Sequence, residues 1–389
     1  MSENVKAMIG KVFNDVADAI ETGSFGSKVR VAVTLLGSEH GVDNVLKGAE
    51  MAQKRNPDKE IAVIGPESVE TDLKVYNAED EDAQHKVMEE LLSSGELDGV
   101  VTMHYNFPIG VSTVGRVITP GIGKEMFIAT TTGTSSASRI EAMIRNAVHG
   151  VATAKAMGIE RPSVGILNVD GARQVERALN QMIEDGYDLE LAESMRADGG
   201  CVMRGNDLLA GTPDVMVMDS LTGNLMMKIS SSYTTGGSIE AMGYGYGPGV
   251  GDGFENEILI VSRASGSPVI ANALEFAGEL AKGKLAQVSK DEFAKAKKAK
   301  MEDIFSDLKK DSAKSASADD EEVEMPEKEV VTGSIAGIDI MDLEDAVTAL
   351  WKEGIYAESG MGCTGPIVMV NEAKVDDATA ALEKAGFLG

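Results

Sequence analysis

The feature that most constrains the fold is an alternation of short, almost continuous apolar runs with amphipathic stretches of helical length. Apolar runs at Val29–Leu36, Gly99–Met103 and Val164–Val169 predict buried strands, and stretches such as Val42–Lys54 and Ala172–Glu184 predict helices. Strands that are apolar on both sides and separated by helices are typical of a parallel sheet covered on both faces. We therefore expect an α/β protein with a largely parallel, doubly wound sheet.

The same reasoning extends the alternation along the chain. The other predicted strands are Ile61–Ile64, Met126–Ala129, Val215–Met218 and Ile258–Ser262, and the other predicted helices are Asp82–Ser93, Ser138–Met157 and Pro268–Leu280. Between them, Thr234–Gly253 is so rich in glycine that we expect no regular element there. A G-x-G-x-x-G match nearby does not join a strand to a helix, so we expect no dinucleotide site.

The composition divides the chain into four parts. We expect an N-terminal helix within residues 1–27, an α/β domain of one or two lobes over 28–287, a charged helical segment with an acidic, solvated linker over 288–329, and a small C-terminal α/β module over 330–389. Within the last part, the predicted strands are Ile335–Ile340 and Pro366–Val370, and the predicted helices are Leu343–Trp351 and Asp376–Ala385.

The net charge excludes several classes of function. The chain has 36 Lys and Arg against 63 Asp and Glu, a formal charge of −27, whereas nucleic acids and anionic membranes bind basic surfaces. No apolar run approaches the roughly 20 residues of a membrane helix, and the first ten residues lack the layout of a signal peptide. Two cysteines without zinc-site spacing predict no disulfide framework and no metal site, and favour the reducing cytoplasm.

Cys363 is the candidate nucleophile. It lies in Glu358-Ser-Gly-Met-Gly-Cys-Thr-Gly-Pro-Ile367, where closely spaced glycines allow tight turns that expose backbone N–H groups beside the sulfur. Such groups stabilise a thiolate, or the oxyanion formed during acyl transfer. The alternative, of equal weight on sequence chemistry, is a small buried hydrophobic residue beside a turn. Cys201 lacks glycines on its C-terminal side, and we expect it to be structural filler.

Two polar segments follow predicted strands, at the edge where open parallel sheets bind ligands. In the first, we expect Asp219–Asn224 to form a turn that, together with Lys228, binds phosphate or an acyl group through Asp219, Thr222, Asn224 and Lys228. In the second, Thr132, Ser135 and Arg139 are candidates for an oxyanion or phosphate cradle at a helix start. The alternative for both segments is helix capping.

These segments resemble the phosphate acyltransferase family of phospholipid synthesis, whose fold is similar to phosphotransacetylases and isocitrate-dehydrogenase-like proteins. The resemblance rests on the strand end Val164-Gly-Ile-Leu-Asn168, on Gly205-Asn-Asp207, and on Asp219-Ser-Leu-Thr-Gly-Asn224 with Lys228. It adds Asn168 as a candidate ligand residue. Departures at residues 129–134 and at Asn206 argue against a long-chain acyl-carrier substrate. Arg263, Lys228 and Arg139 are the cations expected to offset the negative charge around a bound phosphate.

Together with the Cys363 segment, the whole chain resembles the family of component C alpha subunits of glycine/sarcosine/betaine reductase complexes. This resemblance implies that a selenoprotein component A delivers a two-carbon unit, supplied indirectly by component B. Component C converts the unit to an acetyl thioester, with Cys363 at the position of the thioester cysteine, and then to acetyl phosphate. It further implies a hetero-oligomer with a component C beta subunit, inorganic phosphate as co-substrate, and no other cofactor.

Two alternatives stay open. The chain could be a non-catalytic scaffold for a catalytic beta subunit, which the altered phosphate-side motifs favour. It could also be a stand-alone phosphotransacetylase-like enzyme that uses a soluble acyl thioester.

Overall fold

The computed structural model describes residues 28–388 apart from Asp198, 319–322, Glu324, 340–341 and 363–364, together with positions 10, 12, 13, 16, 17 and 20. For 311–318, 361–362 and 365 it describes the backbone only. Most of the helix predicted within residues 1–27 lies outside the described residues, and so does Cys363.

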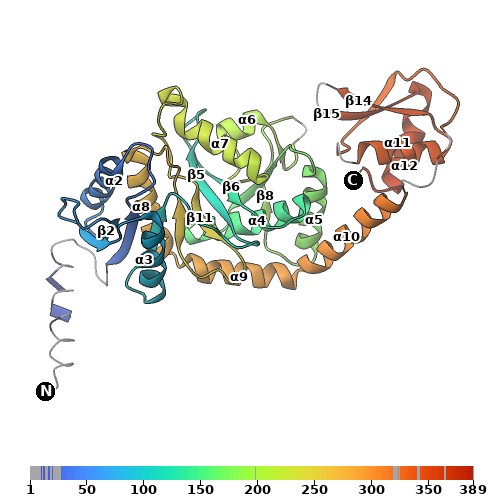
Figure 1. Ribbon diagram of the computed structural model, residues 1–389. Helices are drawn as coiled ribbons and strands as arrows, with labels where there is room; N and C mark the ends of the chain where they lie inside the picture. Colours follow the sequence, from blue (N-terminus) through green and yellow to red (C-terminus); the bar gives the residue numbers. More distant parts are fainter. Residues whose placement is uncertain are drawn as a thin grey trace.

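A twelve-stranded sheet runs through the main body (Figure 1). The first lobe contains parallel strands β1 (Val29–Thr34), β2 (Lys59–Gly65), β3 (Lys74–Asn77), β4 (Gly99–Thr102) and β12 (Ile258–Ile260). The second lobe contains β5 (Ser112–Ile118), β6 (Glu125–Gly133), β7 (Ser163–Leu167), β8 (Glu190–Leu191), β9 (Val202–Met203) and β10 (Val215–Val217). Strand β11 (Gly247–Val250) pairs antiparallel with β12 and with β5, and so joins the two lobes.

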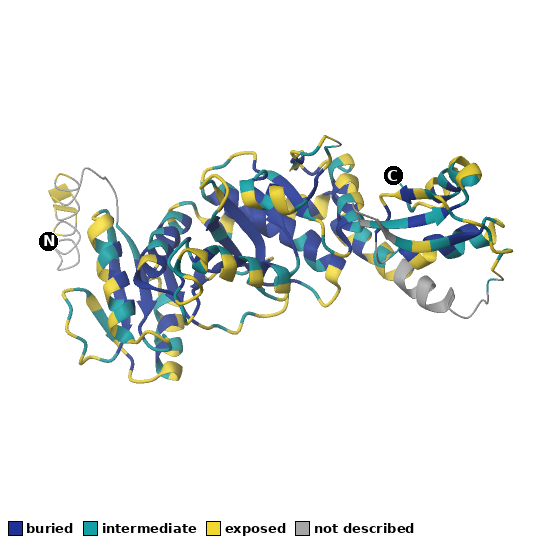
Figure 2. Ribbon diagram, turned by 90° about the horizontal axis from the view of Figure 1, so that it is seen from above, coloured by how far each residue is buried: buried dark blue, intermediate teal, exposed yellow. Residues whose placement is uncertain are grey.

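Helices cover both faces of this sheet. One face carries α2 (Val42–Arg55), α4 (Arg139–Ala156), α5 (Ala172–Glu184), α8 (Ser267–Lys282) and α9 (Leu285–Lys298). The other carries α3 (Glu81–Ser93), α6 (Gly205–Ala210) and α7 (Ser220–Ser232). Each layer buries its own apolar cluster, and Figure 2 shows the buried strands between the more exposed helices. The predicted largely parallel, doubly wound α/β fold is confirmed, with antiparallel pairing confined to β5–β6 and β11.

The prediction that Thr234–Gly253 holds no regular element is wrong, because it contains β11 in the middle of the sheet. Glycine permits this position. A Cβ on Gly247, whose φ is +87°, would lie 1.8 Å from the Val114 carbonyl oxygen, and a Cβ on Gly249 would lie 2.3 Å from the Phe107 ring. The glycines that suggested a loop are therefore those that let neighbouring groups approach this strand closely.

The turn predicted over Asp219–Asn224 is also wrong. Helix α7 begins at Ser220, and the Asp219 carboxylate caps it by accepting from the backbone N–H groups of Leu221 and Thr222 at 3.1 and 3.0 Å. An aspartate that satisfies these free N–H groups starts a helix instead of closing a turn.

Beyond the sheet, α9 belongs to the main body and α10 (Met301–Ala318) leads away from it (Figure 1). Phe293 and Ala296 of α9 are buried against the core, so the boundary predicted between residues 287 and 288 falls inside a packed helix. Its lysines lie on the outer side, which explains why the sequence looked solvated.

The C-terminal module contains β13 (Gly333–Ala336), α11 (Leu343–Lys352), β14 (Ala357–Gly362), β15 (Gly365–Val370) and α12 (Val375–Lys384). Its strands form an antiparallel sheet in the order β13–β15–β14, packed on a separate apolar core. The strand predicted at Ile335–Ile340 ends at Ala336 instead, because Gly337 takes a φ of +100° that is incompatible with a strand.

Candidate functional site

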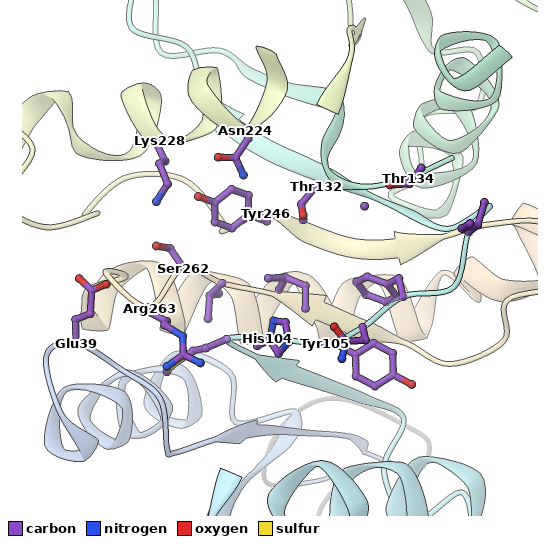
Figure 3. Close-up of a pocket in the computed structure, with 17 residues that line it drawn as sticks. Glu39, His104, Tyr105, Thr132, Thr134, Asn224, Lys228, Tyr246, Ser262 and Arg263 are labelled. Atoms are coloured by element: carbon purple, nitrogen blue, oxygen red, sulfur yellow. The ribbon is translucent and has the colours of Figure 1, made fainter. Parts of the chain in front are cut away.

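A cavity of about 580 Å³ lies between the two lobes (Figure 3). It opens at the carboxyl ends of β4, β6 and β12, where open α/β sheets bind ligands. The second lobe contributes Thr132, Gly133, Thr134, Asn224, Lys228 and Tyr246; the first contributes Glu39, Met103, His104, Tyr105, Asn106, Ser262 and Arg263. Four predicted ligand residues, Thr132, Asn224, Lys228 and Arg263, therefore line one cavity.

Lys228 and Tyr246 form one side of the polar end. The Lys228 Nζ lies 3.6 Å from Glu240 Oε1 and 5.8 Å from the centre of the Tyr246 ring. Burial lowers the pKa of Lys228, but Tyr246 and Glu240 outweigh it and raise the pKa above its ordinary value. Burial and Glu240 also raise the pKa of Tyr246. At neutral pH this side of the cavity therefore offers an ammonium group and a protonated phenol.

Asn224 is positioned by the close approach of α7 to β6. The backbone of Gly223 lies so near β6 that a Cβ there would sit 1.7 Å from the Thr130 carbonyl oxygen. One residue later, Asn224 Nδ2 donates to the Thr131 carbonyl at 3.2 Å. This bond leaves the amide oxygen and the second N–H of Asn224 for a ligand.

Arg263 approaches the cavity from the opposite lobe, directly after β12 and Ser262. Its Nη2 lies 3.2 Å from Glu81 Oε2, and its Nη1 donates to the Gly37 carbonyl at 3.4 Å. These contacts hold the guanidinium at the edge of the cavity, across from Lys228 (Figure 3). The cavity is thus flanked by one cation from each lobe.

Three other predicted ligand residues hold the start of α7 and do not line this cavity. Thr222 Oγ1 donates to Asp219 Oδ2 at 2.7 Å, and Arg139 Nη2 lies 3.1 Å from the same oxygen. Burial raises the pKa of Asp219, but the bonds from Thr222 and the charge of Arg139 outweigh it and lower the pKa. Arg139 also lies 3.6 Å from Asp170. In the structure these side chains satisfy one another.

Ser135 and Asn168 also lie outside this cavity. The Ser135 hydroxyl is buried, donates to Asn146 Oδ1 and lies 2.8 Å from Ser112 Oγ. Ser112 Oγ in turn lies 2.9 Å from His149 Nδ1. Asn168 follows β7, and its backbone N–H donates to the Met203 carbonyl at 2.8 Å. Their roles as ligands remain predictions.

Sequence reasoning missed three ring-bearing side chains that line the cavity, His104, Tyr105 and Tyr246. His104 and Tyr105 follow β4 after Met103, and Tyr246 directly precedes β11. The position after β4 carried a usable signal, because it is a strand end in a parallel sheet. Tyr246 carries no such signal, because the glycines around it predict a loop.

The C-terminal module contacts the main body at the start of α5. Asp339 accepts hydrogen bonds from the backbone N–H groups of Gly171 and Arg173 at 3.1 and 3.3 Å, and Asp342 accepts from Gln174 at 2.5 Å. A carboxylate at a helix N-terminus is stabilised by the free N–H groups there. Helix α5 follows β7, so this contact lies beyond the carboxyl end of β7, a strand that lies two positions from β6 in the sheet.

The chain contains two cysteines, Cys363 and Cys201. Cys363 lies in sequence between β14 and β15, outside the described residues. The Cys201 thiol is buried and donates to Glu176 Oε1 at 3.2 Å. Burial and this carboxylate raise the pKa of Cys201 to about 12, which makes it a poor nucleophile at neutral pH.

The described residues contain neither a cluster of metal-binding side chains nor an apolar helix of membrane-spanning length. No group of three or more His, Cys, Asp and Glu side chains in that part of the chain is arranged to hold a metal ion. No helix among the residues described is long and apolar enough to cross a membrane.

Comparison with known sequences gives related proteins at two levels of sequence identity. A family model described as fatty acid synthesis protein matches residues 29–369. The glycine/sarcosine/betaine reductase complex component C subunit alpha of Peptoclostridium acidaminophilum is 63% identical over 385 residues, which are 99% of each chain. The phosphate acyltransferase of Thermotoga petrophila is 26% identical over 234 residues, covering 52% of this chain and 67% of that protein.

Solved structures match more distantly. A branched-chain phosphotransacylase from Enterococcus faecalis superposes with a TM-score of 0.47 at 16% identity, covering 65% of this chain and 99% of that one. A 4-hydroxythreonine-4-phosphate dehydrogenase from Klebsiella pneumoniae gives a TM-score of 0.42 at 14% identity, covering 66% and 100%.

Proposed function

This chain belongs to the fatty acid synthesis protein family and, within it, to the component C alpha subunits of glycine/sarcosine/betaine reductase complexes, and from that premise we propose that it transfers an acetyl group from a protein thioester to inorganic phosphate. The observation that carries the proposal is the pair of cations, Lys228 and Arg263, that face one cavity from two lobes. In a chain of charge −27, such a pair is needed to bind a phosphate dianion.

In this proposal phosphate occupies the polar end of the cavity. Lys228 and Arg263 balance its charge, and Asn224 and Ser262 supply hydrogen bonds. The part of the cavity lined by Met103 and Tyr105 takes the acetyl group and the thioester arm.

The reaction balances without a redox step. A phosphate oxygen attacks the thioester carbonyl carbon, a C–O bond forms, and the carbonyl electrons move to the oxygen of a tetrahedral intermediate. When that intermediate collapses, the C–S bond breaks, acetyl phosphate leaves, and the thiolate takes a proton from solvent. A hydrogen-bond donor placed on the oxyanion contributes roughly 3 kcal/mol to such a step, and Tyr246 is the donor we assign to it.

We propose Cys363 as the thiol that carries the acetyl group, with component A as its source and the component C beta subunit as partner. The contact between Asp339 and the start of α5 supports this assignment, because it holds the cysteine-bearing module at the same sheet edge as the cavity.

The test separates acylation from transfer. The purified chain, with and without its beta subunit, is incubated with a labelled acetyl donor, and phosphate-dependent release of label is then measured. We expect Cys363→Ala to abolish the acid-stable adduct and Cys201→Ala, the matched control with a buried thiol, to keep it. An adduct that survives Cys363→Ala would refute the assignment.

The phosphate site is tested by Lys228→Met. We expect this variant to acquire the label normally but to need ten- to a hundredfold more phosphate for release, since a hydrogen bond to a charged group contributes about 1.5–3 kcal/mol. Lys74→Met, which removes an exposed ion-paired lysine of β3, is the control. Unchanged phosphate dependence in Lys228→Met would exclude the cavity as the phosphate site. Absence of labelling even with the beta subunit would favour a scaffold, and turnover of acetyl-coenzyme A by the chain alone would favour a stand-alone enzyme.

A further inference from the structure

Glu39 is an acidic side chain in the cavity to which we assign phosphate. It lies in the loop between β1 and α2, and it lines the cavity together with Lys228, Ser262 and Arg263 (Figure 3). Charges of like sign repel each other, and the repulsion is stronger in a cavity than in bulk water. A carboxylate at this position therefore weakens the binding of every anion that presents only lone pairs to it.

The backbone keeps Glu39 at the cavity. Its N–H donates to the Arg263 carbonyl at 2.8 Å, and Arg263 Nη1 donates to the Gly37 carbonyl at 3.4 Å. One residue further along both segments, His40 Nε2 lies 3.2 Å from the Ala264 carbonyl oxygen. These contacts tie the Glu39 loop to the segment that follows β12, so Glu39 stays beside Arg263.

The Glu39 carboxylate is available to a ligand. The two cations of the cavity already face other carboxylates, since Lys228 lies 3.6 Å from Glu240 and Arg263 lies 3.2 Å from Glu81. Among the residues that the structure describes, none forms an ion pair or a hydrogen bond with the side chain of Glu39. An anion bound between Lys228 and Arg263 would thus meet a carboxylate without a partner.

A free carboxylate distinguishes anions by whether they carry a proton. An ionised carboxylate only accepts hydrogen bonds. Slightly above neutral pH, inorganic phosphate is mostly the hydrogen phosphate dianion, whose P–OH group can donate to a carboxylate. Sulfate has the same charge and a similar shape but no proton, so the same carboxylate repels its lone pairs. Repulsion of the wrong ligand is a common source of specificity.

We propose that Glu39 makes the cavity selective for hydrogen phosphate, by accepting a hydrogen bond from its P–OH group and by repelling anions that lack a proton. The proposal rests on the proposed function, because it takes the cavity as the phosphate site. A hydrogen bond to a charged group is stronger than one between neutral groups, so a single contact of this kind is enough for selectivity.

The same contact acts on the product. Near neutral pH acetyl phosphate is a dianion without a proton, because the acetyl group makes the remaining P–OH more acidic. As acetyl phosphate forms, the P–OH proton passes to solvent, which balances the proton that the thiolate takes up. Glu39 therefore holds the substrate and repels the product, which favours product release.

Equilibrium dialysis of the full chain with radiolabelled phosphate tests the proposal. Sulfate is the competitor, and chloride holds the ionic strength constant because salt screens these charges. We expect the wild type to bind phosphate at least about tenfold more tightly than sulfate. Glu39→Gln and Glu39→Ala should each lower this ratio at least about fivefold, mainly by strengthening sulfate binding. Glu70→Gln, at an exposed glutamate between β2 and β3, changes the net charge equally and should keep the ratio.

Lys228→Met separates this proposal from the proposed function. Weaker phosphate binding in Lys228→Met, together with a lowered ratio in the Glu39 variants, supports both. Glu39 variants that are folded by circular dichroism and Tm but keep the wild-type ratio overturn the selectivity and leave the phosphate site standing, as does a wild type that binds both anions equally. Phosphate binding that is absent, or that Lys228→Met leaves unchanged, overturns the phosphate site and the selectivity together.

Discussion

His149 shows what complete burial does to an ionisable side chain in this protein. It lies within α4, its Nδ1 faces the Ser112 hydroxyl at 2.9 Å, and its ring packs 5.4 Å from that of Phe293. Among the described atoms its Nε2 has no hydrogen-bond partner. Burial lowers the pKa of His149 from 6.5 to about 3, so the folded protein holds it neutral.

This burial predicts a pH dependence of stability. Because the folded pKa lies below the unfolded one, the unfolded state takes up a proton first as the pH falls, and stability is lost between pH 6.5 and 3. From pH 7 to pH 5, His149 should lower the free energy of unfolding by about 2 kcal/mol. Urea unfolding of His149→Gln at both pH values should show that much less pH dependence than the wild type. Equal pH dependence in the two proteins would contradict the prediction.

At the scale of elements, glycines decide how closely α7 and β11 approach their neighbours. In α7, the side of Gly223 rests on the β6 backbone, and only the missing side chain allows Asn224 to reach the Thr131 carbonyl. In β11, Gly247 lies against Val114. A glycine inside a helix costs about 1 kcal/mol relative to alanine, so Gly223 indicates that close packing outweighs local helix stability.

The corresponding prediction compares two helical glycines. Gly223→Ala should destabilise the protein by about 3 kcal/mol or more, because the new methyl group would overlap the Thr130 carbonyl and push α7 away. Gly205→Ala, at the first residue of α6, has no heavy atom within 4 Å of the new Cβ and should be neutral or slightly stabilising. Thermal and urea unfolding measure both. Equal effects at the two positions would show that the contact with β6 is unimportant.

At the scale of the whole molecule, Asp339 and Asp342 connect the C-terminal module to the start of α5. Asp339 is buried and occupies the N-terminus of α5, and Asp342 pairs with Gln174 and with Arg177 at 3.1 Å. Helix α10 and the acidic segment after it connect the module to the main body. These contacts with α5 are polar, and the apolar cluster of the module is separate from the core of the main body.

The contact of Asp339 with α5 predicts which backbone amides it protects from hydrogen exchange. Asp339→Ala should raise the hydrogen-exchange rates of the Gly171 and Arg173 amides about tenfold, since each loses a charged acceptor. The core strands should keep their rates. Asp377→Ala, at an exposed carboxylate of α12, is the control and should change neither amide. Unchanged exchange in Asp339→Ala would mean that the module is held by other contacts.

The sequence by itself determined the class of fold and most of its elements. Apolar periodicity is a local property, so Val42–Arg55 and Ala172–Glu184 could be predicted nearly to the residue, whereas β5 and α7 were not predicted. Short strands such as β8 and β9 could not be predicted, because two residues are too few to show a repeating pattern of apolar side chains. Strand β11 could not either, because its glycines are explained only by the neighbours they admit.

Some residues of the candidate site could likewise be predicted from the sequence, and others could not. Strand ends pointed to Thr132, Asn224 and Lys228, because parallel strands bring their carboxyl ends to one edge whatever the rest of the chain does. The separation of Lys228 from Asp219, which caps a helix, and the meeting of Lys228 with Arg263 and Tyr246 were decided by tertiary structure. These contacts depend on how β11 joins the two lobes and on how closely α7 packs against β6. Local sequence patterns do not determine the distance between residues on opposite sides of a cavity.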